Sequence, residues 1–115
     1  MGGDQQDQWQ FFLNRVIFGM TLREAIDAPK FSSEHFPGLF HPHDFYLNRV
    51  RVEESLGEDV LDGLVQRGHE VDAAPAWTEG FLCAVERDSE SGVFEAASDP
   101  RGTKSEVFPS LALAY

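Results

Sequence analysis

Two consecutive glycines near the start of the chain, Gly2 and Gly3, have the residue type and spacing for one kind of chemistry. Glycines just before a helix can direct two backbone N–H groups at one point, because glycine adopts conformations that other residues avoid. Paired donors of this kind suit an oxyanion, and the positive end of the following helix adds to their effect. The pair predicts an oxyanion-binding turn, although glycines at this place are also typical of a flexible terminus.

A second candidate is a proline-containing loop with the sequence His41-Pro42-His43-Asp44. Imidazoles and a carboxylate can meet at one zinc ion. This loop supplies only two ring nitrogens, however, and no third ligand follows at a usual spacing. A surface loop is the simpler interpretation, and we predict no metal site and no cofactor.

Potential nucleophiles lie apart from the groups that would activate them. Ser32-Ser33 has no adjacent base, and His35 and His69 are isolated, which favours packing or solvent contact over chemistry. The single cysteine, Cys83, lies in an apolar run without a neighbouring cation, so we expect a buried, inert thiol. One cysteine also excludes an internal disulfide. The chain has none of the usual nucleotide-binding, serine-hydrolase or zinc-protease motifs, and no catalytic set is predicted.

The charge is strongly acidic, with a net value of −11 in 115 residues. Residues 1–52 carry six acids and five bases, whereas residues 53–115 carry fourteen acids and four bases. An acidic surface repels phosphate backbones, so nucleic acid is an unfavourable partner. The length fits one domain or a piece of one over residues 1–115. Ten Phe in so short a chain raise the question of whether all of them can be buried without a partner.

Targeting signals are not evident in the sequence. No apolar run reaches the roughly 18–20 residues of a membrane span, and the first ten residues do not resemble a signal peptide. Expressed as it stands the chain would remain in the cytoplasm, but this says nothing of the compartment of a longer protein.

Helix signals are densest in the first third of the chain. Apolar residues recur at helical spacing and predict a helix with an apolar stripe, and Gly19 suits the end of that helix. Thr21 and Glu24 form a capping box that begins a second helix, which Pro29 ends. The stripe consists of Trp9, Phe12, Leu13, Val16 and Ile17.

Strand signals follow. Residues 30–34, 49–53 and 69–73 read as strands, with Phe31 packed inward, and 82–87 and 93–97 read as a hairpin. A second capping box, Ser55 with Glu58, begins a helix whose inner face is Leu61, Leu64 and Val65 and which Gly68 ends. This order predicts an α+β fold, with helices packed on a mostly antiparallel sheet.

Several blocks, taken in order, resemble the C-terminal part of the small subunit of gamma-glutamyltranspeptidases. The block from Glu24 to Phe31 and the Ser98-Asp99-Pro100-Arg101 block are specific in combination. The resemblance covers nearly the whole chain, and Asp4-Gln5-Gln6 after the glycines is closer to an acylase-like branch than to the glutathione-cleaving enzymes. The blocks are Gly2-Gly3, residues 14–20, 24–31, 51–53, 64–71 and 97–102.

The resemblance implies part of the αββα sandwich of an N-terminal-nucleophile hydrolase. In that family a new N-terminal threonine attacks a gamma-glutamyl amide, and water or an amino acid then takes the acyl group. The paired glycines, Gly2 and Gly3 here, hold the oxyanion. Thr21, Thr78 and Thr103 do not match the nucleophile, so the resemblance leaves this chain without a catalytic residue.

Two functions follow as hypotheses. The first is a C-terminal fragment of a gamma-glutamyltranspeptidase-like enzyme that is inactive alone and needs the upstream segment or large subunit. The second is a non-enzymatic α+β module that binds a partner or self-associates through exposed apolar surface.

Overall fold

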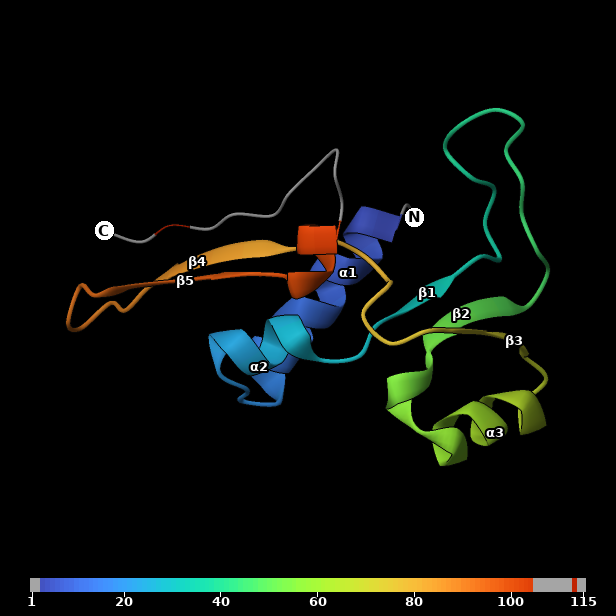
Figure 1. Cartoon of the computed structure of the whole chain (residues 1–115), viewed down its shortest axis with the longest axis horizontal. Coiled ribbons are helices and arrows are strands. Elements are labelled where there is room, and N and C mark those ends of the chain that lie inside the picture. Colours follow the sequence, from blue (N-terminus) through green and yellow to red (C-terminus); the bar gives the residue numbers. More distant parts are fainter. Residues whose placement is uncertain (1–2, 105–112, 114–115) are drawn as a thin grey trace. The chain divides into compact units, whose positions relative to one another are not determined.

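The computed structural model describes residues 3–104 and 113, and within them the chain forms two compact units. The first contains residues 3–7 and 29–79, and the second contains residues 8–28 and 80–104. The helices and strands, labelled in Figure 1, are α1 (Gly3–Phe12), α2 (Leu22–Asp27), β1 (Phe31–Ser33), β2 (Arg49–Glu53), α3 (Glu58–Gln66), β3 (Glu70–Ala74), β4 (Cys83–Arg87) and β5 (Phe94–Ser98).

The first unit is built on a sheet with the strand order β1-β2-β3. β1 pairs with β2 antiparallel, whereas β2 pairs with β3 parallel through the crossover helix α3. Val50 and Val52 of β2 are buried, as the alternating sequence predicts. The strands expected at 30–34, 49–53 and 69–73 are therefore confirmed to within a few residues.

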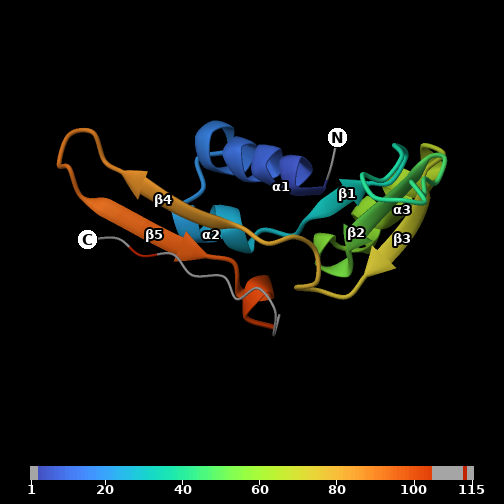
Figure 2. The ribbon, with the colours of Figure 1, turned by 90° about the horizontal axis from the view of Figure 1, so that it is seen from above.

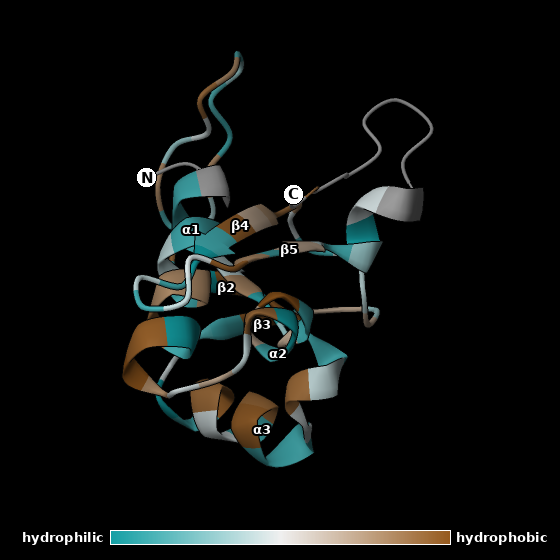
Figure 3. Ribbon diagram, turned by 90° about the vertical axis from the view of Figure 1, so that its left-hand side faces the viewer, coloured by the Kyte–Doolittle hydropathy of each residue, from teal (hydrophilic) through white to brown (hydrophobic). Residues whose placement is uncertain are grey.

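The capping box expected at Ser55 is wrong. Residues Glu54–Leu56 form a 3-10 turn, and α3 begins after Gly57, which has φ 94° and no side-chain cap. Glycine accepts this conformation, so the chain enters the helix through the backbone of Gly57 instead. Hydrophobic residues, brown in Figure 3, recur along α3. Of these, Leu61 and Leu64 are half-buried, whereas Val65 is exposed.

The second unit contains the hairpin of β4 and β5, which is antiparallel as predicted. α2 packs against this hairpin, and Figure 2 shows it beside both strands. Leu22 and Ile26 of α2 and Ala97 of β5 form the buried cluster, with Phe11 and Ala84 packed around it. Burial of these apolar surfaces is the main force that holds the unit together.

Helix α2 begins and ends as the sequence predicts. Thr21 accepts a hydrogen bond from the backbone N–H of Glu24, whose carboxylate accepts one from the N–H of Thr21. Those bonds lower the pKa of the Glu24 carboxyl, the largest cause being the backbone N–H of Thr21. Gly19, after the preceding helix, has φ 68°, the conformation expected of a residue that ends a helix.

Three burial predictions are wrong. Val65, expected on the inner face of its helix, is 56% exposed, and Phe31 is 44% exposed. The apolar stripe Trp9, Phe12, Leu13, Val16 and Ile17 is exposed as well, each residue by more than 40%. Periodicity identifies a common face but not what covers it. Cys83 is exposed too, because it lies on the same face of β4 as the exposed Val85.

None of the helices within residues 3–104 combines the length and apolar character that crossing a bilayer requires.

Candidate functional site

Of the two glycines predicted to bind an oxyanion, the structure describes Gly3 alone. Gly3 is the first residue of helix α1, and Gly2 lies outside the described residues. The first N–H groups of any α-helix have no partner inside the helix and carry its positive end. Gly3 therefore occupies the position where backbone donors for an anion are expected.

A glutamine one turn into α1 fixes this helix start to the sheet of the first unit. The Nε2 of Gln6 donates to the carbonyl of Ser33 at 3.3 Å, and the N–H of Ser33 donates to Oε1 of Gln6 at 2.7 Å. Both polar ends of one side chain are thus bonded to the backbone of one residue in β1. The next residue, Asp7, is buried at 5% exposure. The start of α1 is consequently part of the first unit rather than a free end.

Buried charged side chains lie in the same unit. Glu53, at the end of β2, is fully buried, and Lys30 is 3% exposed. The carboxylate of Glu53 accepts hydrogen bonds from the backbone N–H groups of Lys30, Thr78 and Glu79, at 3.1, 2.9 and 3.1 Å. It therefore ties the entry of β1 and the segment after β3 to the end of β2. Burial of a carboxylate is tolerated because these donors replace water.

Arginines fix the outer part of this sheet. Arg51 contacts Glu79 and Asp72 at 2.8 and 2.6 Å, and these hydrogen bonds raise the pKa of its guanidinium, Glu79 being the larger cause. Arg49 pairs with Glu34, which likewise raises its pKa, and lies 3.5 Å over the ring of Tyr46. These paired charges hold neighbouring strands and the segments beside them together.

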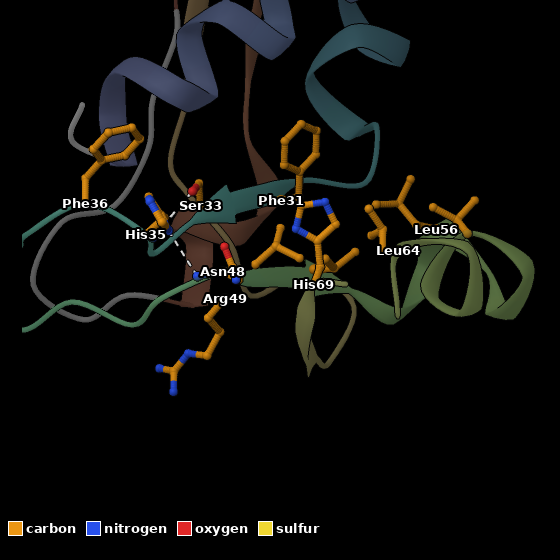
Figure 4. Close-up of a pocket in the computed structure, with 12 residues that line it drawn as sticks. Phe31, Ser33, His35, Phe36, Asn48, Arg49, Leu56, Leu64 and His69 are labelled. Atoms are coloured by element: carbon orange, nitrogen blue, oxygen red, sulfur yellow. Dashed lines mark hydrogen bonds between the residues drawn. The ribbon is translucent and has the colours of Figure 1, made fainter. Parts of the chain in front are cut away.

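An apolar pocket of about 530 Å³ opens on the first unit (Figure 4). Its size falls within the range of small-molecule sites. The walls come from β1, β2 and α3, with polar groups at the rim. The lining residues are Phe31, Ser33, His35, Phe36, Asn48, Arg49, Val50, Val52, Leu56, Val60, Leu64 and His69.

His35, His69 and Ser33 line this pocket, whereas Ser32 does not, and the hydrogen bonds of Ser33 and His35 are not those of a catalytic pair. The Nδ1 of His35 accepts from the N–H of Asn48 at 3.0 Å, and the Oγ of Ser33 accepts from the N–H of His35 at 3.4 Å, as the dashed lines of Figure 4 show. His69 lines the pocket from the position directly before β3. The side chains of Ser33 and His35 thus bond to backbone groups.

The loop with two histidines has a local role. The rings of His41 and His43 are 6.3 Å apart, and Nδ1 of His43 is hydrogen-bonded to the carbonyl of Gly38 at 2.8 Å. Among the described residues no three His, Cys, Asp or Glu side chains are grouped as metal ligands. Thr21 caps α2, and the hydroxyl of Thr78 donates to the carbonyl of Pro75 at 2.6 Å.

The Asp-Pro-Arg block is structural, and it lies in the second unit. Arg101 is buried and donates to the carbonyls of Ile26, Asp27 and Ala28, which end helix α2. Its Nη1 is 3.1 Å from the carboxylate of Asp99, which is fully buried. The two most distinctive blocks of the sequence therefore bind one another.

Sequence reasoning missed Gln6 and Glu53. Neither residue type suggests chemistry by itself, and their partners lie more than twenty positions away. The one useful signal was Glu53 at the inward-facing end of an alternating strand, since a charge there must be paired.

Comparison with known proteins establishes the fold and then the family. The fold is shared with cephalosporin acylase from Bacillus halodurans, which matches with a TM-score of 0.72 at 24% identity, over 100% of this chain and 19% of its own. An acivicin-inhibited gamma-glutamyltranspeptidase matches with a TM-score of 0.61 at 24% identity, over 84% of this chain and 47% of its own. The predicted α+β class is confirmed.

The sequence profile described as gamma-glutamyltranspeptidase matches residues 1–108. The chain belongs to this family, as the resemblance of its blocks predicts. The structure of LmbA2991HD is 42% identical, with a TM-score of 0.81 over 98% of this chain and 20% of its own. The chain thus spans about a fifth of the length of LmbA2991HD and of the acylase. A search of curated proteins finds no match.

Proposed function

We propose that this chain is the C-terminal part of a gamma-glutamyltranspeptidase-like enzyme and supplies the oxyanion-binding turn, Gly2 and Gly3. The complete enzyme would transfer or hydrolyse the acyl group of a gamma-glutamyl or related amide through an N-terminal threonine. That threonine belongs to an upstream segment or to a separate subunit, and residues 1–115 act as one C-terminal domain.

The family match carries this proposal, because it runs from the double glycine through residue 108. The position of Gly3 supports the oxyanion-binding role. Gly3 begins a helix, and the first backbone N–H groups of a helix have no partner inside it and can bind an anion. Donors fixed before the reaction stabilise an oxyanion more than water does, since they need no reorganisation as the charge develops. In the acivicin-inhibited gamma-glutamyltranspeptidase, the C-terminus has critical roles in autoprocessing and catalysis. A similar contribution is proposed for this chain.

The proposed reaction needs an N-terminal threonine, and two of the three threonines of this chain are engaged in other bonds. Thr21 is held in a helix cap and Thr78 is bonded to Pro75, so neither hydroxyl stands at a chain start beside a free amine.

The test begins with the coding sequence upstream of Met1. A threonine-bearing segment encoded there is joined to this chain, and both forms are purified and assayed with gamma-glutamyl-p-nitroanilide and a panel of other acyl anilides. We expect turnover by the longer protein and none by the 115-residue chain. Turnover by the pure chain, or an inactive longer protein, would refute the proposal.

The second candidate is a non-enzymatic module that binds a partner or a second copy. The exposed stripe on α1 and on the π-helical segment Leu13–Ile17 that follows it favours this alternative, since apolar surface of this kind marks interaction sites. Absence of any threonine-bearing segment, in the gene or in a separate one, together with specific self-association, would support the module over the enzyme.

A further inference from the structure

We propose that Gln6 is the positioning residue of the oxyanion turn: its side-chain amide locks the start of α1 to the edge of β1 and so holds the backbone of Gly3 in place. This inference rests on the proposed function for its consequence in catalysis. The lock itself is a property of the described residues.

The bonding of Gln6 is selective. β1 is an edge strand whose inner side pairs with β2: the carbonyl of Lys30 accepts from Glu53 and the N–H of Glu34 donates to Arg49, both at 3.0 Å. Successive residues of an antiparallel strand alternate between facing the partner and facing away. Ser33 therefore presents its N–H and carbonyl to the outer edge, where the amide of Gln6 bonds to both.

The position of Gln6 in α1 gives the lock its effect. It lies three residues after Gly3, which is less than one helical turn, so a bond at Gln6 restricts the backbone at Gly3 directly. Gln6 is half-buried and Asp7 is buried, whereas Gln5 on the same turn is exposed. Gln5 is therefore a control of identical chemistry that lies on the same turn of the helix but faces solvent.

Fixing the turn matters because glycines are the most mobile residues in a chain. Oxyanion donors contribute to the rate only when they are already aimed at the position of the developing charge. Loss of one such donor costs about 10²–10³ in kcat, and a misplacement of about 1 Å can cost about 10²-fold. We therefore expect loosening of the Gln6 lock to lower kcat about tenfold to a hundredfold and to leave KM nearly unchanged.

The first arm of the test measures amide hydrogen exchange in the 115-residue chain. In Gln6→Met the side chain keeps its size but loses both hydrogen-bonding ends, so the N–H of Ser33 should exchange at least about tenfold faster. The N–H of Glu34, bonded to Arg49, should keep its wild-type rate. Gln5→Met should change neither amide. Unaltered exchange at Ser33 in Gln6→Met overturns the lock.

The second arm measures kinetics in the longer protein, in which the threonine-bearing segment is joined to this chain. Gln6→Met should lower kcat as stated, and Gln5→Met should not. Gln6→Glu keeps the acceptor for Ser33 but loses the donor when ionised, and regains it when protonated. Its kcat relative to wild type should therefore rise as the pH falls, a profile that a general loss of stability would not produce.

The outcomes separate the two proposals. An active wild-type protein whose kcat is unaffected by Gln6→Met overturns the positioning role while the proposed function stands. An inactive wild-type protein overturns the proposed function, and the positioning role with it, even where the exchange data show the lock to be present.

Discussion

At the scale of single residues, the buried pair Asp99 and Arg101 has the largest expected effect on stability. Replacing Arg101 by Met removes its bonds to the carbonyls that end α2 and its buried ion pair with Asp99. Breaking a buried pair in this way costs about 3–5 kcal/mol. Urea unfolding should show a correspondingly lower midpoint.

The control for this prediction is Arg67→Met. Arg67, the residue that follows α3, is exposed and donates to the carbonyl of Gly63 in the last part of that helix. Surface changes of this kind usually alter the free energy of unfolding by no more than about 0.5 kcal/mol. Equal midpoints for the Arg101 and Arg67 variants would contradict the structural role of the Asp-Pro-Arg block.

A second residue-scale prediction concerns pH. Arg15 donates to both carboxylate oxygens of Glu86 at 2.7 Å, and this hydrogen bond lowers the pKa of the Glu86 carboxyl. The pair therefore stabilises the fold above the ordinary Glu pKa of about 4.3 and loses that contribution as the pH falls through the lower folded value. Glu86→Gln should reduce the urea midpoint at pH 7 slightly, since both groups are partly exposed.

The difference between wild type and Glu86→Gln should shrink as the pH is lowered below about 4. The exposed hairpin residue Glu90 provides the matched variant, Glu90→Gln, which should show no such pH-dependent difference. A difference that persists unchanged at pH 3 would exclude the ion pair as its cause.

At the scale of the elements, Gly57 before α3 and Gly63 inside it should respond to alanine with opposite signs. Gly57 has φ 94°, which strains any residue with a Cβ even though no neighbouring atom would touch the added methyl. Gly57→Ala should therefore destabilise by about 1–3 kcal/mol through the backbone alone. Gly63 lies inside the helix, where alanine is favoured by about 0.5–1 kcal/mol.

The added methyl at position 63 would meet only Nη1 of Arg67, at 3.1 Å, and that flexible end can move aside. Thermal or urea unfolding of the two variants, with wild type between them, checks the prediction. A stabilising Gly57→Ala would mean that α3 does not begin at that glycine.

The element scale also shows what the sequence could predict. The capping box at Thr21 and the hairpin were predictable because each depends on neighbours within a few positions. The start of α3 was not, because Ser55 and Gly57 both suit a helix start and only the backbone conformation chosen at Gly57 decides between them. The parallel pairing of β2 with β3 depends on contacts about twenty residues apart, which no local pattern specifies.

At the scale of the whole molecule, one part of the candidate site could be predicted from the sequence and another part could not. Gly2 and Gly3 stand out in the sequence by their type, but the support for the turn, Gln6 against Ser33, is made by a polar side chain of ordinary appearance and a distant backbone. Burial was the least predictable property, because Cys83 and the α1 stripe follow patterns that fit either a covered or an open face.

The exposed stripe leads to the last prediction, which concerns association. Trp9, Phe12, Leu13, Val16 and Ile17 are each more than 40% exposed, and removing such surface from water is favourable. The 115-residue chain should therefore bind an apolar dye and self-associate at high micromolar concentration in sedimentation. Exchanging Phe12 and Ile17 for Gln should weaken both, whereas Val93→Thr, an equally exposed hairpin change, should not. A strict monomer without dye binding would contradict an interaction role for the stripe.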